Sequence, residues 1–77
     1  MKIKVYAPSF CSFKDIDEKG YMILQEGAVL NDVYKNLRIP FILRKILFAT
    51  VNYQHSDMKE RLKDGDVVSF FSGLAGG

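Results

Sequence analysis

The sequence is poor in the residue types that build a metal or redox site. It has one cysteine, one histidine, two prolines and no tryptophan among its 77 residues. One cysteine excludes a disulfide scaffold, an iron–sulfur cage and a cysteine-rich zinc site within a single chain. No stretch approaches the roughly 18 apolar residues of a membrane helix, and alternating sequence follows Met1 directly. We therefore expect no membrane span, no secretory signal and a reducing, cytoplasmic location.

The net charge is also small. Eleven Lys and Arg residues against nine Asp and Glu leave a formal charge of +2, which is too weak to predict nucleic-acid binding. The length predicts one small domain, and the hydrophobic share of 48% is that of a globular protein. A chain this short buries only about 60% of its unfolded surface. It has little room for a deep pocket, so we expect a domain that binds, carries or modifies.

Hydrophobic periodicity predicts one helix among several strands. Period-two alternation predicts strands over residues 2–6, 21–25, 46–51 and 67–71. Four apolar residues at i, i+3, i+4 and i+7 predict a helix, namely Leu30, Val33, Tyr34 and Leu37. We expect Asn31 to cap this helix and Ile39-Pro40 to end it. Turns are expected at Asn52-Tyr53 and at 63–66, and a short helical turn or a brief strand within 57–62.

The order of these elements predicts an α+β fold. One short helix covers only one sheet face, and the helix-containing segment allows the first and last strands to pair in parallel. This is the β-grasp (ubiquitin-like) arrangement, a mixed four- to five-stranded sheet with the helix on one face. We expect residues 1–71 to form this domain and residues 72–77 to form a flexible tail.

The last residues of the sequence have an unusual composition. No ionisable side chain follows Asp66, and three of the six glycines fall within 73–77. Gly76 and Gly77 lack Cβ atoms, so this segment is as narrow as a chain can be. Such a tail can enter a channel and offer its carboxyl carbon to a nucleophile or a nucleotide phosphate. The alternative is a frayed terminus without function.

The surrounding sequence favours the first interpretation. The run 62–68, the pair Phe70-Phe71 and the segment 74–77 resemble the MoaD/ThiS family of ubiquitin-like sulfur carriers, as do 26–28 and 49–52. The sequence departs from the family pattern in three places: Tyr53 follows Asn52 where Gly is common, Ser72-Gly73 replaces two prolines, and Val29 replaces a capping Thr. These departures concern the subfamily, molybdopterin or thiamine.

The resemblance implies that other proteins carry out the chemistry. A ubiquitin-activating-type enzyme would use ATP to adenylate Gly77, and a sulfur donor enzyme would convert the adenylate to a thiocarboxylate. The sulfur would then pass to a pterin or a thiazole precursor, with the molybdopterin synthase large subunit or thiazole synthase as partner. The chain would be a non-catalytic co-substrate or synthase subunit that binds no cofactor itself. A ubiquitin-like modifier, joined through Gly77 to lysines of other proteins, is the alternative.

The strand pattern also predicts a surface for these partners. If Val68 and Phe70 point inward, Ser69 and Phe71 face the open side of the sheet, beside Phe48 and Tyr6. We expect an exposed apolar patch there, continued by Leu74 and Ala75 of the tail.

Other reactive residue types have simpler interpretations. We expect Cys11 to be a small buried hydrophobe and His55 an exposed, unligated turn residue, because further metal ligands are lacking. Asp64 and Asp66 belong to a glycine-containing turn. Four scattered cations are expected on a solvated face: Arg44, Lys45, Lys59 and Arg61.

Overall fold

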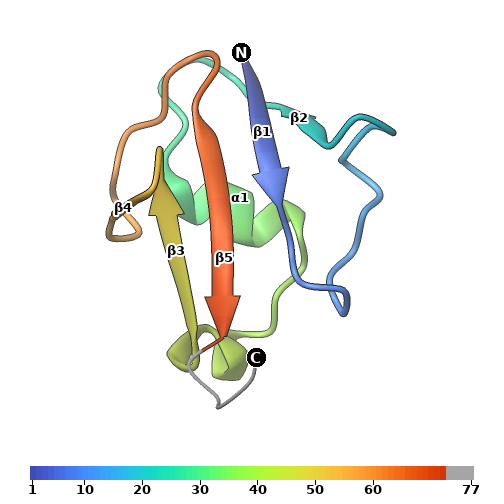
Figure 1. Cartoon of the computed structure of the whole chain (residues 1–77), viewed down its shortest axis with the longest axis vertical. Coiled ribbons are helices and arrows are strands. Elements are labelled where there is room, and N and C mark those ends of the chain that lie inside the picture. The colour runs from blue at the N-terminus through green and yellow to red at the C-terminus, as the bar shows by residue number, and fades with distance from the viewer. Residues whose placement is uncertain (73–77) are drawn as a thin grey trace.

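A five-stranded mixed sheet carries one α-helix against a single face, as Figure 1 shows for the computed structural model. The structure describes residues 1–72. The strands are β1 (Lys2–Tyr6), β2 (Tyr21–Ile23), β3 (Leu47–Val51), β4 (Gln54–His55) and β5 (Val67–Ser72). The helices are α1 (Leu30–Asn36) and the 3-10 helix η1 (Phe41–Lys45). This confirms the predicted β-grasp fold class.

The sheet order is β2-β1-β5-β3-β4. Strand β5 lies between β1, which it pairs in parallel, and β3, which it pairs antiparallel. Strands β1 and β2 form an antiparallel pair at one edge, and the two-residue β4 lies at the other. The last strand therefore runs through the middle of the sheet, as the element order predicts.

The core lies between the sheet and α1. The four predicted helix residues are all buried, and so are the predicted inward residues of the first and last strands, apart from the half-buried Phe70. The best covered of these side chains are Ile3, Met22, Leu30, Val33, Leu37 and Val68. In Figure 1 the helix crosses behind β5 and β1, and no helix or strand of residues 1–72 covers the other face of the sheet.

The start of α1 differs from the prediction. Asn31 is not the cap: Val29 precedes the helix, and its N–H donates to the Asp32 carboxylate over 2.9 Å. Two further N–H groups at this end, those of Leu30 and Asn31, donate to the carbonyls of Glu60 and Met58. The first N–H groups of a helix have no partner within it, so residues 57–62 bond to these donors. They form one hydrogen-bonded turn, in which the Glu60 N–H donates to the Asp57 carbonyl, and an isolated bridge between Arg61 and Val29, rather than a helix or a full strand.

The helix also ends earlier than Ile39-Pro40. Its last residue is Asn36, and Arg38 then adopts a left-handed backbone with φ of 56°. A residue in this conformation commonly follows a helix, because it redirects the chain. After Pro40, bonds from Leu43 N–H to the Pro40 carbonyl and from Ile46 N–H to the Leu43 carbonyl form η1, which the sequence did not predict.

Two strands were predicted too long, and the last was predicted one residue too short, because β5 includes Ser72, which was assigned to the tail. Strand β2 stops at Ile23 rather than 25, and β3 begins at Leu47 because Ile46 caps η1. The Asn52-Tyr53 turn is confirmed, with φ of 53° and 68° at its two residues. Within residues 1–72, no helix is both long and apolar enough to cross a bilayer.

Candidate functional site

Three aromatic side chains gather on the uncovered face of the sheet. The register places Phe48 directly opposite Phe71, and Tyr6 opposite Ser69 on the other side of β5. Tyr6, Phe48 and Phe71 are 53%, 47% and 52% exposed. We call these three residues the aromatic patch. They are the described members of the predicted partner surface, and the structure brings them to adjoining strand positions.

Ser69 lies between the members of the patch but is not exposed. It shares a row across the sheet with Tyr6 and Thr50, and only 6% of its surface is accessible. Larger neighbouring side chains cover a small side chain on a central strand. The exposed surface at this position is therefore aromatic, and the Ser69 hydroxyl adds little to it.

Polar groups border the patch on both sides. The Lys4 ammonium lies 5.6 Å from the centroid of the Tyr6 ring, and the centroid of the His55 imidazole lies 6.1 Å from that of the Phe48 ring. An apolar centre with a polar border is typical of a protein-binding surface. The position of His55 corrects one prediction: it is exposed, as expected, but it belongs to strand β4 rather than to a turn.

The patch lies where β5 finishes. Phe71 is the penultimate residue of this strand, and the pairing of Leu47 with Ser72 places the start of β3 and the preceding η1 at the same end of the sheet. The described part of the chain therefore ends on a central strand, beside the aromatic patch. The predicted tail residues Leu74, Ala75, Gly76 and Gly77 lie outside the described residues.

Cys11 is buried, as predicted. Burial raises the pKa of its thiol, because a thiolate is less stable away from water. The neutral thiol therefore predominates at neutral pH. This is opposite to the lowered pKa of a cysteine that is activated as a nucleophile.

Asp64 and Asp66 serve the turn that contains them. The Asp66 carboxylate accepts hydrogen bonds from the Asn52 amide at 3.0 Å and from the Lys63 N–H at 2.8 Å. The Asp64 carboxylate accepts from the Lys2 N–H at 2.7 Å. Both carboxylates thus tie the turn to neighbouring segments, which confirms the structural interpretation of the pair.

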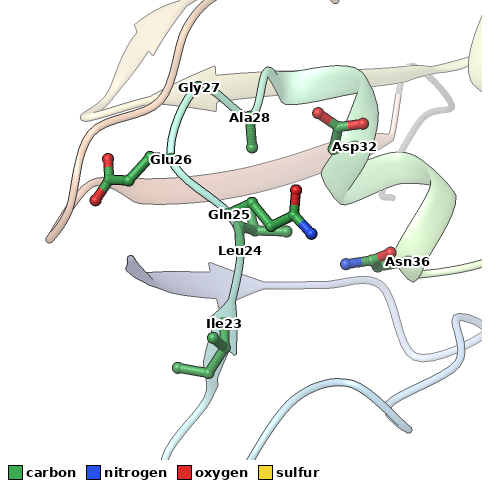
Figure 2. Close-up of a pocket in the computed structure, with 8 residues that line it drawn as sticks. All are labelled: Ile23, Leu24, Gln25, Glu26, Gly27, Ala28, Asp32 and Asn36. Carbon is green, nitrogen blue, oxygen red and sulfur yellow. The ribbon is translucent and has the colours of Figure 1, made fainter.

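A polar hollow of about 430 Å³ lies between the β2–α1 connection and the helix (Figure 2). Figure 2 shows the Gln25 amide pointing toward the side of Asp32 and Asn36, whereas Glu26 points away from them. The Asp32 carboxylate is bonded to the Val29 N–H, and the Asn36 amide lies 3.6 Å from the sulfur of Met22. Across residues 1–72, no cluster of three or more His, Cys, Asp and Glu is placed to hold a metal ion.

The sequence analysis missed an exposed apolar pair outside the aromatic patch, and it predicted a solvated position for Arg44 that the structure does not show. Phe41 and Ile42 of η1 are 76% and 73% exposed. Arg44 does not simply project into solvent, because its guanidinium lies 5.4 Å from the centroid of the Tyr34 ring and donates to the Asn31 amide oxygen at 3.0 Å. The signal available was the apolar triplet between Pro40 and two cations, which fits neither a helix nor a strand pattern.

Comparisons with known proteins agree with this architecture. The sequence profile of the ThiS family matches residues 12–77. The structure resembles the crystal structure of SAMP1 from Haloferax volcanii, with a TM-score of 0.58, 13% sequence identity, and coverage of 99% of this chain and 97% of that chain. At this identity the likeness concerns the fold. A search of curated proteins returned no match.

Proposed function

Because the chain belongs to the ThiS family, we propose that it is a sulfur carrier whose C-terminal Gly77 is charged by an ATP-dependent enzyme. The observation that carries this proposal is the route of the chain: the central strand β5 carries Phe71 of the aromatic patch and leads directly into the segment that contains Gly76 and Gly77. The family match extends through these glycines.

The proposed cycle begins with adenylation. The carboxylate of Gly77 attacks the α-phosphate of ATP, so that an acyl–phosphate bond forms and pyrophosphate leaves. A sulfide equivalent from a sulfur donor enzyme then attacks the acyl carbon, a carbon–sulfur bond forms, and AMP leaves. Adenylation is needed because a carboxylate is a poor acyl donor. The product is a thiocarboxylate, which serves as a sulfur nucleophile.

The domain supplies recognition for this cycle. We propose that the aromatic patch docks on the adenylating enzyme, because the patch lies beside the end of β5 and can reach the partner as the tail enters its active site. Leu74 and Ala75 would line the entrance of that channel. The nucleotide belongs to the partner, and the chain supplies the acyl group.

The sulfur acceptor defines two branches of the proposal. A molybdopterin synthase would use the thiocarboxylate to sulfurate a pterin, and a thiazole synthase would use it to build the thiamine thiazole. Presenting the thiocarboxylated protein to each synthase in turn, and measuring loss of sulfur from the carrier, distinguishes them.

Intact-mass analysis tests the proposal. The protein is incubated with ATP, a sulfur donor and the adenylating enzyme of its host. Replacement of one oxygen by sulfur supports the carrier. High-mass conjugates support the alternative, a ubiquitin-like modifier attached through Gly77 to lysines, and an unchanged mass contradicts both.

Deletion of Gly77 is the matched control for this experiment. We expect the shortened protein to show no mass change while its unfolding curve stays the same, because the last residue of a chain usually contributes little to stability. A shortened protein that still gains sulfur would overturn the assignment of Gly77.

A further inference from the structure

A hollow of about 500 Å³ opens next to η1, and its lining is separate from the aromatic patch. Its lining residues are Val29, Asn31, Phe41, Arg44, Lys45, Met58 and Lys59. The apolar members are the exposed Phe41 ring, the half-buried Met58 and Val29. Three cations and no acidic residue complete the lining, so the hollow combines an apolar centre with positive charge.

The central cation, Arg44, is held in place by neutral groups. One terminal nitrogen donates to the Asn31 amide oxygen, and the guanidinium lies over the Tyr34 ring. Its Nε has no hydrogen-bond partner among the described residues. A guanidinium has five N–H donors, so this arrangement orients the group and leaves its charge uncompensated. An oriented arginine loses less conformational entropy when it binds a carboxylate.

The two nearby acidic residues do not neutralise the hollow. The Asp57 carboxylate accepts a hydrogen bond from the Lys59 backbone N–H at 2.8 Å. It lines a neighbouring hollow, which shares Arg44, Lys45 and Met58 with this one. Glu60 is exposed and is absent from the lining. The lining of this hollow therefore carries three positive charges and no negative one.

We propose that this hollow is a docking site for an acidic segment of a partner protein. An apolar side chain of the segment would pack between Phe41 and Met58, and its carboxylates would pair with the three cations. Three cations around a concavity suit a short peptide, whereas attraction to anionic membranes usually involves clusters of 4–8 basic residues. The proposal does not depend on sulfur transfer, because it rests on described residues of the domain alone.

A labelled peptide probe tests the site. The probe is the fluorescein-labelled peptide Glu-Asp-Leu-Phe-Asp-Glu, and its controls replace either all carboxylates with amides or Leu-Phe with Ser-Ser. We expect anisotropy to show binding of the first peptide only, and the affinity to fall as salt is added. Amide resonances of Asn31, Arg44, Lys45 and Lys59 should shift on titration.

Charge-reversal variants provide the matched comparison. We expect Lys45→Glu to weaken binding by at least about fivefold, whereas Lys14→Glu, an equal charge change on an exposed loop residue outside the hollow, should change it less than about twofold. Phe41→Ser should also weaken binding. Deletion of Gly77 should have no effect, which separates this proposal from the carrier function.

Four results would overturn the proposal. These are equal affinity for the acidic and amide peptides, equal effects of the two lysine variants, peptide-induced shifts confined to the aromatic patch, and binding to anionic phospholipid vesicles without binding to the peptide. If Phe41→Ser fails to fold, the lysine variants decide the question, because both side chains are exposed.

Discussion

The side-chain amide of Asn52 donates a hydrogen bond of 3.0 Å to the carboxylate of Asp66, and its oxygen accepts another from the Val67 N–H. The two residues belong to different turns, 14 positions apart in the sequence. Together they join the β3–β4 turn to the start of β5, the strand that leads to the terminal glycines. The bond thus lies at the start of β5, at the opposite end of the strand from Ser72.

Loss of this bond should destabilise the domain. Asp66→Asn places an NH₂ group where two donors, from Asn52 and Lys63, now meet a carboxylate. Leaving buried polar groups without partners costs about 1–3 kcal/mol, and we expect that decrease in the free energy of unfolding by urea denaturation. Asp64→Asn is the control, because Asp64 is exposed and accepts one such bond. Equal stability of the two variants would contradict this assignment.

The aromatic patch should matter for binding and not for folding. We expect Phe71→Asp to weaken binding to the adenylating enzyme by about tenfold or more, as for a central interface residue, with an unchanged unfolding midpoint. Ile23→Asp is the matched control: Ile23 is 68% exposed on β2 at the edge of the sheet, away from Phe48 and Phe71. Calorimetric titration measures the binding of both variants, and thermal denaturation measures their unfolding midpoints. A Phe71→Asp protein that unfolds would show that this ring supports the core.

A substitution in the β3–β4 turn should stabilise the domain. Tyr53 has a φ of 68°, which costs a residue with a Cβ atom about 1–2 kcal/mol. Glycine removes this cost but loses about 0.5–1 kcal/mol more in conformational entropy. We therefore expect Tyr53→Gly to raise the free energy of unfolding by up to about 1.5 kcal/mol. Gly65→Ala, at φ of 88°, should lower it, and urea denaturation of both variants checks the sign.

Cys11 should react slowly in the folded protein. Its pKa is raised by burial, so at neutral pH we expect reaction with a disulfide reagent to be at least about tenfold slower than in urea. The pKa of the Cys11 thiol is higher in the folded protein than in the unfolded chain, so the folded state favours the neutral thiol. The resulting contribution to the free energy of unfolding is fully present below the unfolded pKa. It is lost as pH rises through the folded pKa. Cys11→Ala should remove that alkaline loss. Equal reactivity in both states would contradict burial.

The faces of the regular elements were predictable from local sequence. Alternation placed Ile3 and Val5 inside, and the i, i+3, i+4, i+7 spacing placed Leu30 and its three companions on one buried helix face. These patterns depend on the geometry of a strand or a helix alone, because side-chain direction repeats every 2 or 3.6 residues. The element order was then enough to predict the β-grasp sheet.

Long-range contacts decided the remainder. The carbonyls of Met58 and Glu60 satisfy the start of α1, and the Asn31 amide orients Arg44 instead of capping the helix. Each contact joins segments that no short pattern relates, so periodicity could not reveal them. The sequence alone determined four of the five strands, the α-helix and the likeness to a sulfur-carrier family. Only the tertiary structure decided which aromatic rings share an exposed surface and which cations line a hollow, because those neighbours meet only when the chain is folded.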